Sequence, residues 1–422
     1  MISRRTFLGA VSAGATAAGL SAGQQLKGER KKLAIVTTEW RFHSHAWHMG
    51  ERFLAGYPVQ GNWHRPPLDV VSAYVDQTPK DDLSRQRTRE FGFKIYPTIA
   101  EALRCGADKL AVDAVLVIGE HGDYPTNELG QKKYPRYEFF KQVTEVFKKD
   151  GRTVPVFNDK HLSWKWEWAK EMVDTARTLD FPLLAGSSLP LTWRMPAIDM
   201  PFDADIEEVM CIAIGSVDSY DFHALETIQC MVERRKGGES GVVALQALRG
   251  DAVWKAMGVK PWKGGGWNPR LFEACLCRSQ TLAQAQTCSH RYPTAAQMHD
   301  WVKEPVAYRF EYADGLKATM LLLNGLVGDF TFAAKLRGKE EPLSTLFYLP
   351  PNPNVVYSAA LMAKAEELFL TGKAPCPIER TLLTTGLVAA GMRSLASGQK
   401  RLETPHLAIR YGVGKESHFL RA

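Results

Sequence analysis

The sequence predicts an α/β protein that begins with a doubly wound parallel sheet and continues as an α+β region with an open antiparallel sheet. In the first half, short apolar runs alternate with amphipathic segments, which is typical of a sheet with helices on both faces. In the second half, four strand-like segments between residues 308 and 348 are separated by hairpin signals. The sheet type is therefore expected to change along the chain.

The first region is expected to supply parallel strands, because its apolar runs are short and end in turn residues. The run Ala114–Ile118, which stops at Gly119, is typical of a strand buried on both faces. The expected strands are 33–36, 69–75, 95–96, 114–118 and 153–157, with helices over 46–55, 85–91, 99–105 and 136–149. Since strands and helices alternate, the sheet should be parallel and Rossmann-like.

The second region has a different pattern. Helices are expected over 164–179, 221–234, 355–370 and 378–397, and strands over 182–185, 206–214 and 242–248. A meander of four strands follows over 308–312, 317–323, 329–336 and 344–348, with hairpin turns at 313–315 and 324–325. These patterns place domain boundaries so that 1–30 precedes the fold, 31–157 is Rossmann-like and 158–422 is α+β.

The composition is that of a soluble globular protein, with 422 residues of which 45% are hydrophobic and 23% charged. The formal net charge is +7, and Arg4 and Arg5 contribute two of these charges. A small charge that is scattered along the chain argues against nucleic acid as the main partner. The seven cysteines have neither a zinc-binding spacing nor a disulfide pattern, which is typical of buried small side chains.

The N-terminal segment predicts export. Ser3-Arg-Arg-Thr-Phe-Leu8 resembles the twin-arginine signal, and a weakly apolar run rich in alanine and glycine follows to about Ala22. That run is too short and too rich in glycine for a stable membrane span. We therefore expect a periplasmic or otherwise exported protein whose first 30 residues are signal and linker. A disordered basic N-terminus is the alternative.

Two ionisable residues, Glu120 and His121, follow the strand 114–118 after one glycine. In open α/β sheets, ligands bind beyond the carboxyl ends of the strands. These two side chains are therefore expected at a functional site. Residues that end the other strands are expected at the same edge: Thr37, Thr38 and Asp76.

Several segments resemble the first domain of the Gfo/Idh/MocA oxidoreductases. They are Val70–Asp76, Phe91-Gly92, Tyr96–Leu103 and Val112–Ile118. Further matches are Lys160, Ala185–Ser188, Asp221–His223, Leu370–Pro375 and Gly391–Ser394. The resemblance implies a dinucleotide-binding domain over 31–157 and a substrate and oligomerisation domain over 158–422. It also implies tightly bound NAD or NADP, a carbohydrate or polyol substrate, and a homo-oligomer that forms through the C-terminal sheet.

The resemblance carries residue roles to this chain. Lys160 would lie beside nicotinamide and substrate, and His223, with Asp221, would move the proton of the oxidised hydroxyl. The residues expected to bind the cofactor are Thr37, Thr38, His43, Asp76, Glu120 and His121. Structural alternatives remain open: a solvated loop for Lys160, a helix cap for Asp221, an interface position for His223 and a turn for Asp76.

Two features depart from the family pattern. The glycine-rich turn that lets a pyrophosphate approach the backbone is replaced by Thr37-Thr-Glu-Trp-Arg-Phe42, and no glycine follows before Gly50. The usual Glu-Lys-Pro appears as Asp159-Lys160-His161. Both changes fall where the dinucleotide and the catalytic lysine would lie.

Histidines form a second chemical signal. His43, His45 and His48 lie close together in the sequence, and His121 is expected at the same edge. Neutral imidazoles suit zinc, iron or manganese, although a polar lining that binds a sugar or the cofactor is the alternative. The sequence thus supports an exported nicotinamide-dependent oxidoreductase, a non-redox metal-assisted sugar hydrolase or lyase, or a non-catalytic sugar-binding protein.

Overall fold

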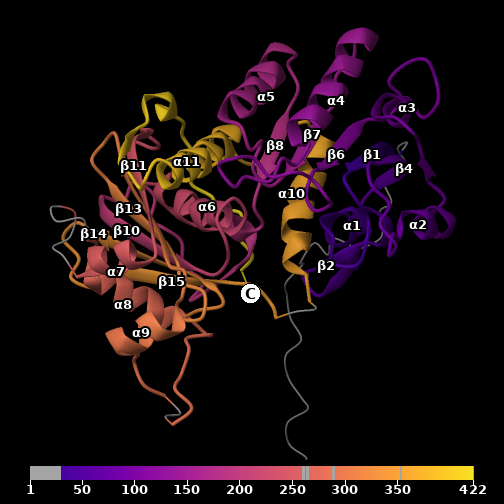
Figure 1. The fold of residues 1–422 in the computed structure, drawn as a ribbon. Coiled ribbons are helices and arrows are strands. Elements are labelled where there is room, and N and C mark those ends of the chain that lie inside the picture. The colour runs from indigo at the N-terminus through magenta and orange to yellow at the C-terminus, as the bar shows by residue number, and fades with distance from the viewer. Residues whose placement is uncertain (1–29, 259–261, 263–265, 288–289, 352–353, 422) are drawn as a thin grey trace, which may run out of the picture. The chain divides into compact units, whose positions relative to one another are not determined.

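The computed structural model of the protein describes residues 30–258, 262, 266–287, 290–351 and 354–421. The predicted twin-arginine segment lies outside these residues. From Lys31 onward the chain forms one compact unit that contains two large sheets (Figure 1). None of the helices in the described residues combines the length and the apolarity that a membrane crossing needs.

The first sheet confirms the predicted Rossmann-like architecture, because its six strands are all parallel in the order β5-β4-β1-β6-β7-β8. These strands are β1 (Lys31–Thr37), β4 (Leu68–Val75), β5 (Lys94–Ile95), β6 (Ala114–Ile118), β7 (Val156–Asp159) and β8 (Leu183–Gly186). A small hairpin of β2 (Tyr57–Val59) and β3 (Asn62–His64) precedes β4. Strand β8 lies beyond residue 157, where the sequence places a domain boundary, and continues the parallel sheet.

Helices cover both faces of this sheet. Alternate side chains of β1 point to opposite faces, and both sets are buried under helices. The helical segments of this half are η1 (a π-helix, Ala46–Gly50), α1 (Glu51–Ala55), α2 (Ser84–Phe91), α3 (Ile99–Arg104), α4 (Arg136–Asp150), α5 (Trp166–Thr178) and α10 (Tyr357–Thr371). Leu33 and Ile35 share a buried cluster with α1 and α10, whereas Ala34 and Val36 share one with α3, α4 and α5. The chain therefore returns late to cover the first sheet with α10.

The second sheet is mixed, with the order β16-β11-β12-β13-β10-β14-β15-β9. Its strands are β9 (Trp193–Met195), β10 (Ile206–Ala213), β11 (Val242–Arg249), β12 (Val306–Tyr312), β13 (Lys317–Leu322), β14 (Phe330–Leu336), β15 (Leu343–Tyr348) and β16 (Leu402–Glu403). The predicted four-strand meander is wrong, since β10 lies between β13 and β14 and runs parallel to β13. Asn324, expected in a hairpin turn, instead bonds Gly215 beyond the end of β10 through both its side-chain oxygen and nitrogen.

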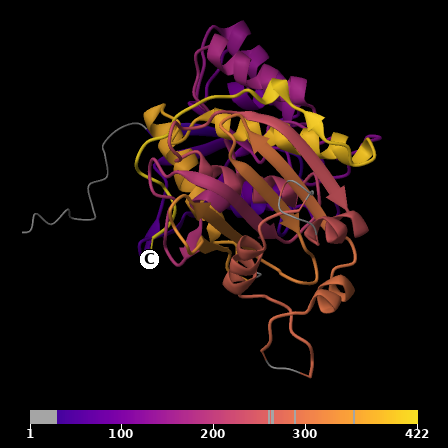
Figure 2. The ribbon, with the colours of Figure 1, turned by 90° about the vertical axis from the view of Figure 1, so that its left-hand side faces the viewer.

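Helices lie on both faces of the second sheet as well. One face shares a buried cluster with α6 (Tyr220–Val232) and α11 (Ile378–Ala396). The helices α7 (Asp251–Met257), α8 (Pro269–Arg278) and α9 (Ala295–Trp301) lie against the other face (Figure 2). Met210 and Ile212 are buried between that face and these helices. The single turns η2 (Leu189–Leu191) and η3 (Pro405–Leu407) complete the set. The helices α7, α8 and α9 thus cover part of the second sheet, through which the homo-oligomer was expected to form. Oligomerisation stays a prediction.

Candidate functional site

The carboxyl ends of β1, β6, β7 and β8 lie along one edge of the parallel sheet. Five side chains near this edge influence one another electrostatically, and we call them the carboxyl-edge cluster. They are His45, Glu120, His121, Lys160 and His223. The sequence predicts four of them for the site and offers His45 only as a metal ligand.

Lys160 is buried rather than solvated, with a relative exposure of 5%. It follows β7 in a left-handed conformation with φ of 64°, and its backbone N–H donates to the Gly186 carbonyl at the end of β8, at 3.2 Å. Its Nζ lies 3.5 Å from Oε1 of Glu120 and 5.9 Å from the ring centroid of Tyr220. The ammonium group is therefore held between the first sheet and α6.

Glu120 anchors a buried charge network. Its carboxylate accepts a hydrogen bond from Arg136, which is fully buried, and also faces Lys160. Burial alone would raise the pKa of Glu120, but the positive charges of Lys160 and Arg136 hold it well below its ordinary value. Arg136 also donates to Nε2 of His161 at 3.0 Å, so that imidazole nitrogen is unprotonated. Lys160 thus faces a carboxylate that is ionised at neutral pH.

His223 lies in the first turn of α6, where its Nδ1 is 2.6 Å from Oγ of Ser187. Burial, reinforced by the positive charge of Lys160, lowers the pKa of His223 well below 6.5. The imidazole is therefore neutral at neutral pH and is able to accept a proton. The Tyr220 ring centroid lies 5.8 Å from that of His223 and 5.9 Å from Nζ of Lys160, so both groups neighbour the same aromatic ring.

Asp221 has structural partners. Its Oδ1 accepts from the backbone N–H groups of Ser219 and Phe222, at 3.1 and 2.8 Å, and its Oδ2 accepts from the Tyr308 hydroxyl at 3.0 Å. Burial raises the pKa of Asp221 to about 6. The carboxylate ties the start of α6 to β12, and in this arrangement it positions the turn that carries His223.

His45 is paired with a buried carboxylate. Its Nδ1 lies 2.5 Å from Oδ2 of Asp159, and its ring centroid lies 4.5 Å from that of His48 and 5.0 Å from that of His121. Burial, followed by the charge of His45, lowers the pKa of His121 to about 3. His45 and Asp159 therefore form a close pair at the end of β7, and Asp159 directly precedes Lys160.

Of the four histidines expected together, His45, His48 and His121 are neighbours and His43 is not. The ring of His43 packs against Phe42 and Trp47 instead, with centroid distances of 4.2 and 5.2 Å. Nδ1 of His48 bonds Oγ of Ser358, at 2.7 Å. Within the described part of the chain, no three His, Cys, Asp or Glu side chains are arranged to hold a metal ion.

The residues predicted to hold the cofactor are bonded to the protein itself. The Thr37 hydroxyl donates to the Glu39 carbonyl at 3.2 Å, and the Thr38 hydroxyl donates to the Glu120 carbonyl at 2.5 Å. Asp76 accepts a hydrogen bond on each carboxylate oxygen, from Tyr74 and Tyr124, both at 2.6 Å. The Asp76 N–H also donates to the Thr37 carbonyl, at 3.0 Å, so the carboxyl end of β1 is tied to the β4 side as well as to the β6 side.

No protein-family model and no curated protein matches the chain. Solved structures do match. GenD2 from gentamicin A biosynthesis, in complex with NAD, has a TM-score of 0.55 at 14% identity and covers 91% of this chain and 99% of its own. The myo-inositol dehydrogenase from Lactobacillus casei, in complex with NAD(H) and myo-inositol, has 0.51 at 13% identity and covers 88% and 96%. A probable dehydrogenase from Thermotoga maritima has 0.52 at 11% identity and covers 89% and 99%.

The chain has the Gfo/Idh/MocA fold. Within this fold, three partners of the cluster escape prediction from the sequence: Arg136, Asp159 and Ser187. Arg136 is the first residue of a helix, where a charged residue is ordinary and gives no signal. Asp159 had the best signal, since it precedes Lys160 directly. Ser187 enters the sequence prediction only as part of the matching segment Ala185–Ser188.

Orphaned polar atoms gather at the same edge of this Gfo/Idh/MocA fold. Among the described residues, five buried atoms on the β6 and β7 side of this edge have no hydrogen-bond partner: Nε2 of His121, Nε of Arg136, Oδ1 of Asn158, Oδ1 of Asp159 and Nδ1 of His161. Buried polar groups are normally paired, so such a concentration is typical of an edge that receives a polar ligand or ordered water.

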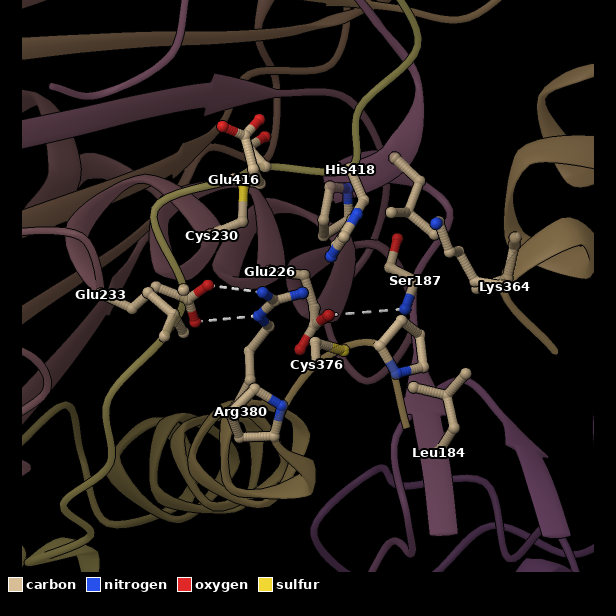
Figure 3. Close-up of a pocket in the computed structure, with 18 of the residues that line it drawn as sticks. Leu184, Ser187, Glu226, Cys230, Glu233, Lys364, Cys376, Arg380, Glu416 and His418 are labelled. Carbon is tan, nitrogen blue, oxygen red and sulfur yellow. Dashed lines mark hydrogen bonds and ion pairs between the residues drawn. The ribbon is translucent and has the colours of Figure 1, made fainter. Parts of the chain in front are cut away.

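A cavity of about 210 Å³ lies behind Ser187 (Figure 3). Ser187 lines it and also bonds His223, so this residue separates the cavity from the cluster. Inside, Arg380 forms a bidentate pair with Glu233, and burial raises the pKa of Glu226 to about 7. Residues 413–418, which we call the C-terminal strap, supply one wall.

Proposed function

We propose that this protein is an enzyme that transforms a carbohydrate or polyol, with Lys160 and His223 as its acid–base pair. The observation that carries the proposal is that both groups neighbour the Tyr220 ring. Each group has its own orienting partner, Glu120 for the amine of Lys160 and Ser187 for the imidazole. An amine and an imidazole that are each held by a partner, and that lie near each other, are suited to general acid–base catalysis.

The roles follow from the charges. The Lys160 ammonium would stabilise negative charge that develops on a substrate oxygen, and the neutral His223 would take or return a proton. The His45–Asp159 pair, which lies beside Lys160 in the chain, would hold a second hydroxyl or exchange a second proton. A polyhydroxyl compound offers oxygens to all three groups, and it would also satisfy the orphaned polar atoms of the edge.

A second candidate is oxidation of a hydroxyl-bearing carbon by a nicotinamide cofactor. The observation that favours it is the fold shared with GenD2 and with the myo-inositol dehydrogenase, both solved with NAD. In that reaction Lys160 and His223 would keep the same proton-handling roles. The two candidates therefore differ only in whether a dinucleotide is held at β1.

The test is hydrogen exchange and turnover on a panel of polyols, sugars and keto-sugars in D₂O, read by NMR and mass spectrometry. We expect deuterium to enter at one carbon of an accepted compound, and both Lys160→Met and His223→Asn to reduce the rate by about 100-fold or more. Lys170→Met is the control, because Lys170 is exposed and pairs along its own helix with Asp174. Full activity in both site variants, or binding without any product, would refute the catalytic proposal.

We also propose that the protein is exported through the twin-arginine route. The support is the Ser3–Leu8 motif together with the alanine- and glycine-rich run that follows it. Fusion of the first 30 residues to a reporter that is active only after export tests this proposal. Replacing both Arg4 and Arg5 by lysine should abolish reporter activity, and unchanged activity would exclude the route.

A further inference from the structure

The turn after β1 is where a dinucleotide-binding fold meets its ligand. In such folds the pyrophosphate lies over the carboxyl end of the first strand, against bare backbone N–H groups and a helix N-terminus. The ribose hydroxyls then bond a carboxylate at the end of the neighbouring strand. Each of these contacts has a counterpart position in this chain.

Several backbone and side-chain groups of the β1 turn are bonded within the protein. The N–H of Thr38 donates to the Ile118 carbonyl of β6 at 3.1 Å. Trp40 is fully buried, donates its indole N–H to Glu51 at 3.0 Å, and stacks on Phe93 with a centroid distance of 5.7 Å. A bulky anchored side chain thus occupies the turn in which a dinucleotide fold has glycine.

The charge at this turn is wrong for a phosphate. Glu39 is buried at the turn, and the ionised Glu120 ends the adjacent strand. The cations nearby are already used: Arg41 lies 2.6 Å from Glu39, while Arg136 and Lys160 pair with Glu120. A pyrophosphate would therefore meet two carboxylates whose counter-charges are committed.

A bridge crosses the end of β1. Strand β1 lies between β4 and β6, and the loops that follow those two strands are bonded to each other. The side chain of Gln77 donates to the Asp123 carbonyl at 3.1 Å and accepts from the Asp123 N–H at 2.9 Å. The Tyr124 hydroxyl donates to Asp76 at 2.6 Å. We call these contacts the loop bridge, and it spans the place where the pyrophosphate would cross.

We propose that this chain does not hold NAD or NADP at β1, and that its site acts without a dinucleotide on a carbohydrate that already carries a carbonyl group. The residues present do not fit the cofactor, on three separate grounds: a filled turn, committed counter-charges and the loop bridge. The substrate class rests on the proposed function, whereas the exclusion of the dinucleotide rests on these contacts alone.

The requirement for a carbonyl follows from proton chemistry. A C–H bond beside an ordinary hydroxyl is not acidic, but one beside a carbonyl is. His223 would remove that proton, the electron pair would form the enediolate double bond, and the carbonyl oxygen would carry its negative charge beside Lys160. Return of the proton gives an isomer, and departure of a β-oxygen with that proton gives an elimination product. The substrate must therefore carry its carbonyl before it reaches this site, as an open-chain aldose, a ketose or an oxidised sugar does.

Two measurements on the purified mature protein test the exclusion. Mass spectrometry of the denatured protein should find no released dinucleotide, and titration with NAD⁺, NADH, NADP⁺ and NADPH should show no saturable binding up to about 1 mM. Hydrogen exchange in 37–41 and 120–124 should be the same with and without NADH. Near-stoichiometric release, saturable binding or protection of these amides by NADH would overturn the proposal.

The exclusion and the proposed function fail separately. The D₂O assay, run without added cofactor on keto-sugars and their parent sugars, should show exchange only with the keto compounds. If a dinucleotide binds while Lys160→Met still abolishes turnover, only the exclusion is wrong. If no dinucleotide binds but Lys160→Met and His223→Asn remain fully active, only the acid–base assignment is wrong.

Discussion

Two halves of one sheet edge are built in opposite ways. At β1, backbone and side chains are bonded to the loops on either side, and the loop bridge of Gln77, Asp76, Asp123 and Tyr124 crosses above them. At β7, β8 and α6, titratable groups face one another and buried polar atoms are left without partners. The same fold can thus keep proton-handling chemistry while it gives up the surface that holds a dinucleotide.

Glu120 belongs to both halves, because its carbonyl bonds Thr38 and its carboxylate bonds Arg136 and Lys160. Glu120→Gln would leave two buried cations uncompensated, so we expect a loss of about 3–5 kcal/mol in the free energy of unfolding. Urea unfolding measures this loss. Glu101→Gln is the matched control, since Glu101 is an exposed residue of α3.

The pH dependence of stability sharpens this prediction. Because the folded-state pKa of Glu120 is held well below 4.5, its contribution is present above about pH 4.5 and is lost as the pH falls through the lowered value. Glu120→Gln should therefore lose part of the acid dependence. A variant with unchanged stability and unchanged acid dependence would contradict the buried charge network.

Lys160→Met is expected to have the largest effect on turnover, a loss of about 100-fold or more, because a neutral side chain cannot stabilise charge on a substrate oxygen. Rates in the D₂O assay measure it, with Lys170→Met as the exposed control and circular dichroism to check folding. If turnover stayed within a few-fold of the unmodified enzyme, the contrast between the two halves would break.

Ser187→Ala should have an intermediate effect. The variant loses the hydrogen bond that fixes the His223 ring, and we expect kcat to fall about tenfold while KM changes little. Since the pKa of His223 lies well below 6.5, turnover of the unmodified enzyme should stay level as the pH falls through 6.5. The exposed residue Ser397 provides a control, Ser397→Ala. An unchanged kcat in Ser187→Ala would remove Ser187 as a positioning residue.

Gln77→Ala should have the smallest effect. It removes two exposed hydrogen bonds of the loop bridge, so we expect about 1 kcal/mol less stability, faster hydrogen exchange in 120–124 and unchanged turnover. Gln142→Ala, on the exposed face of α4, is its control. A large loss of turnover would mean that the β1 half takes part in the reaction, against the comparison drawn above.

The sequence predicts much of this edge because the residues at the ends of short apolar strands can be identified from the sequence alone. Glu120 and His121 follow β6 and Lys160 follows β7, and parallel strands bring their carboxyl ends together. Partners that come from distant elements give no such signal. Ser187 bonds a residue 36 positions away, and β10 enters the second sheet between β13 and β14 because of contacts that hairpin signals do not encode.

Packing between residues close in the sequence explains why the predicted position of His43 is wrong. His43 was expected with His45, His48 and His121, but neighbouring aromatic rings at Phe42 and Trp47 pack around it. The spacing of the histidines alone does not predict this packing between neighbouring aromatic rings. The position of α10 is equally hard to predict, because its apolar face does not indicate which of the two sheets it covers.

The C-terminal strap matters for handling the purified protein. Directly after the strap, the ring centroid of Phe419 lies 4.1 Å from Cζ of Arg194, and the N–H of Leu420 donates to the Leu191 carbonyl at 3.0 Å. Proteolytic cleavage before Phe419 would release this anchor and open the thiols of Cys230 and Cys376 to oxidants. Intact mass and alkylation kinetics, followed together during storage, would report such damage early.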